Sequence, residues 1–307
     1  MKTIQKPSWI KAKIPGGKNY NHLKNLVKEL QLNTVCAEAK CPNIGECWGA
    51  GTLTFMILGD TCTRSCGFCH VKTGKGGELD WEEPERVAEA VRKLSDNNAH
   101  ITHIVITSIN RDDKNYESAC IFAETINKVR AANPDIKIEV LIPDFKGENH
   151  AIDEVIEARP DILNHNIETV SRLYSHPQIT QSGKTRYVRP QADYNRSLDL
   201  LKRSKQSGLL TKTGIMLGLG ESYDEVIETL NNLNQNKCDI VTIGQYLQPT
   251  LDHIPVSKFY HPTEFESLKQ YGEKVIGIPH IESGPLVRSS YHAEKQLIKL
   301  TTTAPNG

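Results

Sequence analysis

The sequence predicts an α/β fold, a partial (β/α)6 barrel that is not fully closed. Six short apolar runs are each followed by a segment whose apolar residues have helical spacing. Strand-then-helix units repeated in this way imply parallel strands joined by right-handed crossovers. A doubly wound open sheet is the alternative, but the turn after the first strand carries cysteines where that fold has a glycine-rich dinucleotide loop.

The expected elements follow one another regularly from residue 53 onward. Pro84 suits the first turn of the first barrel helix, because its missing N–H has no partner there anyway. The predicted strands are residues 54–58, 103–107, 137–142, 162–167, 211–217 and 239–246. The helices that follow them are residues 83–94, 116–132, 150–158, 194–207, 222–234 and 263–275. A helix at 22–32 precedes the barrel, and a long polar loop runs from 168 to 193.

The composition limits the classes of function. Lys+Arg and Asp+Glu balance at 37 each in 307 residues, so no global charge points to nucleic acid. No apolar run approaches the ~20 residues that span a bilayer. The N-terminus also lacks the pattern of a signal or transit peptide. Eight clustered cysteines then indicate metal binding in a reducing compartment rather than disulfides, so we expect a cytoplasmic location.

Six of the eight cysteines fall into two groups of three. Each group is one ligand short of the four that close a tetrahedral or cuboidal metal site. A group of three therefore leaves one iron of an iron–sulfur cluster open to another ligand. The groups are Cys36-x4-Cys41-x5-Cys47 and Cys62-x3-Cys66-x2-Cys69.

The second group follows the first predicted strand, at the end of the barrel where chemistry gathers in such folds. Gly67 relieves the backbone of this loop. Zinc is one alternative, but it needs a fourth ligand, and His70 is awkwardly placed beside Cys69. An electron-carrying ferredoxin centre is another, but its fourth cysteine is normally close by.

The loop Cys62-Thr-Arg-Ser-Cys66-Gly-Phe-Cys69 resembles that of the radical S-adenosylmethionine (SAM) superfamily. The resemblance implies a [4Fe–4S] cluster whose open iron binds the amino and carboxylate groups of SAM. One electron from the reduced cluster then splits the S–C5′ bond. The 5′-deoxyadenosyl radical that forms abstracts hydrogen from an unactivated carbon.

The same resemblance implies further cofactor contacts. Phe68 lies against the adenine, or simply shields the cluster from water. Asn166 and Glu168 bind ribose hydroxyls, although Glu168 is alternatively an exposed strand end. The glycine-rich segment 214–221 lets backbone approach the adenine, or serves strand–helix packing. The methionine amino group is held where the second strand ends, by Thr107, Ser108 and Asn110.

The first group, Cys36-Ala-Glu-Ala-Lys-Cys41-Pro-Asn-Ile-Gly-Glu-Cys47, resembles that of the lipoyl synthase family. The resemblance continues through residues 107–113, 165–170, 188–190 and 288–291. It implies an auxiliary [4Fe–4S] cluster that gives up its sulfur, with a serine as fourth ligand. The implied ligands of this cluster are Cys36, Cys41, Cys47 and Ser290. An iron–alkoxide bond is harder and less covalent than an iron–thiolate bond, so this corner can be released.

Lipoyl synthases insert sulfur at C6 and C8 of an octanoyl chain on a lysine of a lipoyl carrier domain. The implied partners are the E2 subunits of 2-oxoacid dehydrogenases, the H protein of glycine cleavage and a low-potential electron donor. We expect a monomer without nucleic-acid or membrane partners. The catalytic residues would be Cys62, Cys66, Cys69 and Ser290. The implied domains are an auxiliary-cluster extension (1–52), the radical SAM barrel (53–278) and a serine-bearing extension (279–307).

Other classes remain as alternatives. Methylthiotransferases also carry two clusters, but their auxiliary cysteines are spread through a separate N-terminal domain. Biotin synthase shares the SAM half but lacks the upstream cysteines. A two-cluster electron carrier or scaffold would cycle both clusters intact and would not consume SAM.

Several other residues allow two interpretations. Seven lysines precede the first acidic residue, and they form either a solvated N-terminal arm or a docking surface for an acidic partner. They are Lys2, Lys6, Lys11, Lys13, Lys18, Lys24 and Lys28. Three arginines orient SAM, carrier acids or cluster ligands, or are structural: Arg111, Arg189 and Arg288. Cys120 and Cys238 are expected to be small core residues.

Overall fold

The computed structural model describes residues 5–50, 52–96, 102–291 and 293. The chain divides into two compact units. Unit 1 contains the described residues of Met1–Lys11, Ser65–Cys69 and Asn164–Gly307, and unit 2 those of Ala12–Arg64 and His70–Leu163. The second cysteine group therefore contributes Cys62 to unit 2, whereas Cys66 and Cys69 belong to unit 1.

The strands of unit 2 follow the order β1-β2-β5-β6-β7. Here β1 (Asn33–Thr34) is antiparallel to β2 (Thr54–Ile57), while β2, β5 (His103–Ser108) and β6 (Lys137–Leu141) are parallel. All four residues of β2 are buried. A parallel strand covered on both faces reads as a continuous apolar run, which is why this one is visible in the sequence. Strand β7 (Ile162–Asn164) crosses the boundary between the units.

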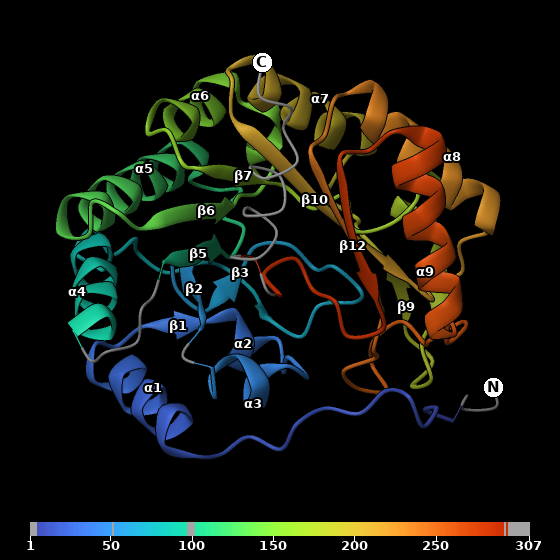
Figure 1. Cartoon of the computed structure of the whole chain (residues 1–307), viewed down its shortest axis with the longest axis horizontal. Coiled ribbons are helices and arrows are strands. Elements are labelled where there is room, and N and C mark those ends of the chain that lie inside the picture. The colour runs from blue at the N-terminus through green and yellow to red at the C-terminus, as the bar shows by residue number, and fades with distance from the viewer. Residues whose placement is uncertain (1–4, 51, 97–101, 292, 294–307) are drawn as a thin grey trace. The chain divides into compact units, whose positions relative to one another are not determined.

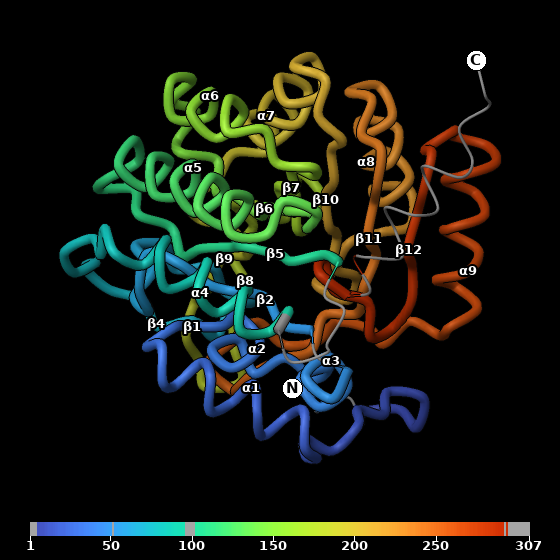
Figure 2. The backbone as a smooth tube through the Cα atoms, turned by 60° about the vertical axis from the view of Figure 1, so that its left-hand side comes forward, coloured from blue at the N-terminus to red at the C-terminus, as the bar shows by residue number. Residues whose placement is uncertain are grey.

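Helices account for most of the remainder of unit 2. They are α1 (Lys18–Glu29), α2 (Val35–Glu38), α3 (Ile44–Cys47), α4 (Glu83–Asp96), α5 (Asn115–Ala132), η1 (Phe145–Gly147) and α6 (Asn149–Glu157). Helices α4, α5 and α6 lie side by side (Figure 2). Two short strands, β3 (Thr61–Cys62) and β4 (Lys72–Thr73), pair beside the cysteine loop.

Unit 1 is built on β10 (Leu210–Leu217), β11 (Ile240–Gln245) and β12 (His280–Gly284), all parallel. The segment from Asn164 to Glu168 runs along β10. The helices are η2 (Ser171–Tyr174), α7 (Tyr194–Gln206), α8 (Tyr223–Gln235), α9 (Pro262–Tyr271) and the π-turn η3 (Gly272–Ile276). Helix α9 packs along β12 (Figure 1).

The predicted strands and barrel helices are present, with boundaries shifted by a few residues. The capping box of Ser222 and Glu225 begins α8 where the sequence indicates. The expected helix 263–275 instead ends at Tyr271 and continues as the π-turn. At Gly272 a Cβ would lie 2.2 Å from Ile281 Cδ1, so this glycine lets the turn approach β12.

The sequence did not predict β12, the pair β3–β4, or the short elements β1, α2 and α3. The long loop to Asp193 was wrong in part. It contains η2 and an antiparallel hairpin, β8 (Pro177–Ile179) with β9 (Thr185–Tyr187). No helix within the described ranges is long and apolar enough to cross a membrane.

Candidate metal centre

The sulfur of Cys62 lies among backbone amides of unit 2. Cys62 Sγ accepts hydrogen bonds from the N–H groups of Arg64 and Asn110, each at 3.4 Å. Thr63 ties the loop to the same place, because its N–H and its hydroxyl both donate to Asn110 O at 3.0 Å. Cysteine sulfurs hold iron–sulfur clusters, so a Cys62 sulfur fixed in this way is a suitable ligand.

Two polar atoms at the end of β5 have no hydrogen-bond partner within the described residues. They are Ser108 Oγ and Asn110 Oδ1, both buried. Thr107 differs, since its hydroxyl donates to Leu141 O at 3.0 Å and so joins β5 to β6. A buried orphan acceptor is costly unless a ligand supplies a donor. The pair fits an ammonium group, whereas Thr107 is already satisfied.

The rest of the cysteine loop packs within unit 1. Gly67 N–H donates to Tyr187 O at 2.9 Å, and a Cβ at Gly67 would lie 2.5 Å from that same oxygen. His253 Nε2 donates to Cys69 O at 2.9 Å. Phe68 packs against the hydrophobic core of unit 1. Gly67 is therefore needed because the chain approaches Tyr187 O closely, and not because of an unusual backbone angle.

The end of the fourth predicted strand is fixed by β10. Glu168 N–H donates to Gly214 O, and Glu168 O accepts from Met216 N–H, both at 2.8 Å. Its φ is +64°, a strained value for a residue other than glycine. Burial raises the pKa of Glu168, against the opposing effects of Arg189, Asn166 and Arg288. Glu168 is therefore a held carboxyl group and not a loose strand end.

Asn166 connects this carboxyl group to the C-terminal motif. Its amide donates to Glu168 Oε1 at 3.1 Å, and its Oδ1 accepts from Ser289 Oγ at 2.8 Å. A Cβ at Gly214 would lie within 2.9 Å of Asn166 Oδ1, Ser289 Oγ and Thr242 Oγ1. Glycine at 214 thus leaves room for a crowded set of polar groups.

All three arginines have partners, and Arg288 donates from Nη1 to Val287 O at 2.7 Å. The contacts of the other two point to structural roles. Arg189 donates to Asn166 O at 3.0 Å and to the Tyr174 hydroxyl at 2.7 Å, and lies over the Tyr174 ring. Arg111 pairs with Asp113 at 2.9 Å and donates to Gly77 O. These contacts favour the structural interpretation for both.

The first cysteine group lies entirely in unit 2. Cys36 is on α2 and Cys47 on α3, with Cys41 between them. Burial raises the pKa of Cys36 to about 11, and the neighbouring Cys41 adds to the shift. Cys41 N–H donates to Cys36 O at 3.1 Å, which folds the segment back on itself. Three thiols this close in sequence suit a soft metal cluster.

Ser290 lies in unit 1, in the turn after β12, and is partly exposed. No two of the cysteines form a disulfide, and all eight are among the described residues. Within those residues no three Cys, His, Asp or Glu side chains are placed together as an ion site. The donor types fit iron–sulfur clusters, and the assignment of each ligand stays a prediction.

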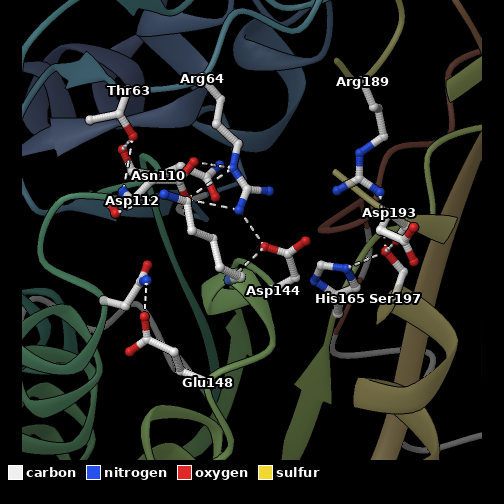
Figure 3. A network of polar contacts seen from close by, with 12 residues as sticks. Thr63, Arg64, Asn110, Asp112, Asp144, Glu148, His165, Arg189, Asp193 and Ser197 are labelled. Carbon is white, nitrogen blue, oxygen red and sulfur yellow. Dashed lines mark hydrogen bonds and ion pairs between the residues drawn. The ribbon is translucent and has the colours of Figure 1, made fainter. Parts of the chain in front are cut away.

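Sequence reasoning missed a buried ion-pair network next to Cys62. Arg64, only 3% exposed, contacts Asp112 and Asp144 (Figure 3). The available signal was an arginine inside the cysteine loop together with acids after the second and third strands. Figure 3 also shows His165 of unit 1, whose Nε2 lies 3.0 Å from Ser197 Oγ.

The remaining residues are placed as follows. Cys238 is buried, as expected, whereas Cys120 is only half-buried on α5, so its assignment to the core was wrong. The arm lysines Lys11, Lys13 and Lys18 are exposed, and Lys2 lies outside the described residues.

Unit 1 contains a cavity of about 620 Å³ beside the loops that follow β10 and β11. Lys6 of the N-terminal arm, Arg172 and His176 line it, with apolar side chains such as Phe259. Arg172 is also paired with Glu225 at 2.6 Å. None of the described residues that line the cavity is Asp or Glu.

Comparison with known proteins gives two family matches. Residues 56–233 match the radical SAM superfamily, and residues 2–41 match the N-terminal domain of lipoyl synthase of the radical SAM family. The mitochondrial lipoyl synthase of Nematostella vectensis is 50% identical, over 95% of each chain. The lipoyl synthase of Rubrobacter xylanophilus is 52% identical, over 95% of this chain and 86% of that protein.

Solved structures agree on the fold. The FeFe-hydrogenase maturase HydG from Carboxydothermus hydrogenoformans matches 92% of this chain and 70% of its own, with a TM-score of 0.56 and 15% identity. The match to methylornithine synthase covers 85% of this chain and 81% of that chain, with a TM-score of 0.52 and 16% identity. Together with the family matches, these likenesses confirm the predicted α/β fold class of the radical SAM type.

Proposed function

The chain belongs to the lipoyl synthase family of the radical SAM superfamily, and we propose that it inserts two sulfur atoms into an octanoyl chain carried on a lysine. Family membership makes it a sulfurtransferase that uses SAM and a [4Fe–4S] cluster. The proposal adds the positions C6 and C8, the lipoyl carrier domain as substrate, and a second cluster as the sulfur donor.

One observation carries the radical half of the proposal. Ser108 Oγ and Asn110 Oδ1 are buried orphan acceptors, and Asn110 also donates to Cys62 Sγ. When bound at three cysteines, a [4Fe–4S] cluster supplies the electron that generates a 5′-deoxyadenosyl radical from SAM. Ser108 and Asn110 would bind the ammonium group of SAM, while Glu168 would accept from ribose hydroxyls.

The sulfur-donating half rests on the first cysteine group. Cys36, Cys41 and Cys47 would hold three irons of the auxiliary cluster, and Ser290 the fourth. The partly exposed Ser290 lies in a turn, which suits a ligand that must leave while the cluster gives up sulfide.

Carrier recognition has its own support. The cavity of unit 1 is lined by basic side chains and, among its described residues, by no acid, and Lys6 joins it to the lysine-rich arm. An acidic segment of a carrier such as an E2 subunit or the H protein would complement this charge. A low-potential electron donor and a cytoplasmic location complete the proposal.

The test is a reconstitution without oxygen. The chain is supplied with iron, sulfide, SAM, a reductant and an octanoylated carrier domain. We expect 5′-deoxyadenosine together with a carrier mass increased by two sulfur atoms. Unchanged SAM with two reducible clusters would instead support an electron carrier or scaffold.

A further inference from the structure

We propose that Arg64 is a positioning residue, which fixes the Cys62 sulfur and its two amide donors by clamping the cysteine loop to the ends of β5 and β6. This inference rests on the proposed binding of a cluster by Cys62. It concerns residues of unit 2 alone, and it assigns a task to an arginine to which the proposed function gives none.

The guanidinium group forms a fork between two carboxylates. Arg64 Nε lies 3.0 and 2.8 Å from the two carboxylate oxygens of Asp112, and Nη2 lies 2.8 Å from Asp112 Oδ1. Nη2 also donates to Asp144 Oδ1 (Figure 3). Only the planar, five-donor guanidinium can bind one carboxylate in a bidentate manner and reach a second.

Both aspartates are themselves held in place. The backbone N–H of Asp112 donates to Thr63 Oγ1 at 3.0 Å, and the backbone O of Asp112 accepts from Lys146 Nζ at 3.2 Å. Asp144 Oδ1 accepts from Lys146 N–H at 3.1 Å, so the same acid caps η1 after β6. Arg64 thus reaches the loop after β5 and the turn after β6. The loop after β5 is tied back to the cysteine loop through Thr63, and the turn after β6 is tied to the loop after β5 through Lys146.

The location gives this network a role beyond stability. Arg64 is two residues from Cys62, and its own N–H is one of the two donors to the sulfur. The second donor, Asn110, is two residues from Asp112. The side chains of Arg64 and Asp112 therefore hold in place the two backbone segments whose amides reach Cys62 Sγ.

The chemical consequence concerns the reduction potential. Hydrogen bonds to cluster sulfurs raise the potential, because they stabilise the more negative reduced state. Loosening the clamp should lengthen the two N–H···S contacts and make the cluster harder to reduce. A purely structural arginine would change the unfolding temperature without moving the potential.

The experiment compares three variants of the full chain, reconstituted without oxygen. Arg64→Lys keeps the charge but loses the fork, and Thr63→Val removes the hydroxyl that accepts from Asp112 N–H. Arg92→Lys is the matched control, because Arg92 pairs with Glu89 on the surface of α4. The midpoint potential and the EPR spectrum of the reduced radical SAM cluster are measured, together with the melting temperature of the cluster-free chain.

In Arg64→Lys we expect the ratio of reduced to oxidised cluster at a fixed potential to fall about tenfold. For one electron this corresponds to a midpoint potential lower by about 59 mV. Thr63→Val should give a smaller shift in the same direction, and Arg92→Lys none. A wild-type potential and EPR spectrum in Arg64→Lys would overturn the proposal, whatever happens to the melting temperature. If that variant does not fold, an unshifted Thr63→Val decides against it. A chain that inserts no sulfur but shows these shifts would remove the proposed function and leave this inference standing.

Discussion

The two cysteine groups have the same ligand type, but Cys62 of the second group and the cysteines of the first group have different surroundings. Cys62 Sγ accepts two amide hydrogen bonds at 3.4 Å, beside a buried arginine with two carboxylate partners. In the first group Cys36 and Cys47 lie on two four-residue helices with Cys41 between them, and burial raises the pKa of Cys36 to about 11. Two backbone amides therefore hold the Cys62 sulfur in place, while burial makes a charged thiolate at Cys36 costly.

In the proposed function the radical SAM cluster lasts through turnover, whereas the auxiliary cluster gives up its sulfur. The different surroundings of the two groups suit these two roles. A site that contains the buried Cys36 thiol, whose pKa is raised, and whose proposed fourth ligand is a hydroxyl should be easier to take apart. The predictions below test this contrast in order of decreasing effect.

The largest effects are expected from two single variants, one in each cysteine group. Cys62→Ala should lower 5′-deoxyadenosine formation by at least about 10³-fold, since even losing an outer partner of a ligand costs about 10–100-fold. Cys41→Ala should still cleave SAM but add no sulfur to the carrier. Chromatography of 5′-deoxyadenosine and mass spectrometry of the carrier measure the two outcomes.

The iron content provides a check on the same variants. Wild type should hold about eight irons per chain and each variant about four, as two [4Fe–4S] clusters require. Cys120→Ala, half-buried on α5, serves as the control and should change neither value. If Cys41→Ala still added two sulfurs to the carrier, the first cysteine group would not be the sulfur donor, and the proposed difference between the groups would be wrong.

Ser290→Ala removes the proposed hydroxyl ligand of the auxiliary cluster and should affect the two activities differently. Sulfur insertion should fall by about 10–100-fold, while SAM cleavage stays close to wild type, because only the auxiliary cluster loses a partner. Ser290→Cys should retain iron better than wild type but release sulfur more slowly, since thiolate binds iron more covalently. Ser267→Ala on the exposed face of α9 is the control. Equal losses of both activities in Ser290→Ala would assign the serine to the SAM half instead.

The contrast between the groups also marks the limit of sequence reasoning. Buried parallel strands such as Thr54–Ile57 read as apolar runs, so the barrel elements were predictable. Strand β12 was not, because His-Ile-Glu-Ser-Gly carries little apolar signal and exists through pairing with β11. The ion pair of Arg64 with Asp144 joins residues 80 positions apart. Such a contact depends on the fold, so no local pattern announces it.

The carboxyl group of Glu83 holds the backbone between β2 and the second cysteine loop. Its carboxylate accepts from Leu58 N–H at 2.7 Å, where Leu58 has a φ of +72° just after β2. Burial raises the pKa of Glu83 from 4.5 to about 7. The folded chain therefore keeps this proton between pH 4.5 and 7 while the unfolded chain has lost it. Stability from this group is complete below pH 4.5 and falls as pH rises to 7.

The difference in unfolding free energy between wild type and Glu83→Gln should change by about 3 kcal/mol across that range. Urea unfolding of the cluster-free chain from pH 4.5 to 8 measures it. Glu85→Gln, on the same helix but exposed, should show no such slope. A parallel pair of curves for wild type and Glu83→Gln would mean that the loop entry does not depend on this carboxyl group.

The smallest effect is expected at the N-terminal arm, which precedes the first cysteine group. Lys11, Lys13 and Lys18 are exposed, so their charges act through solvent and are screened by salt. Changing all three to Glu should raise the apparent KM for the octanoylated carrier by roughly 3–10-fold at low salt, with the effect fading above physiological ionic strength. The kcat should hold, because none of the three is proposed to touch SAM or a cluster. A control set of exposed lysines outside the arm, Lys202, Lys237 and Lys274 changed to Glu, separates a specific docking arm from a general change in net charge. An unchanged KM and salt dependence in the arm variant would leave the arm as a solvated segment, and carrier capture would then fall to the basic side chains of the unit 1 cavity alone.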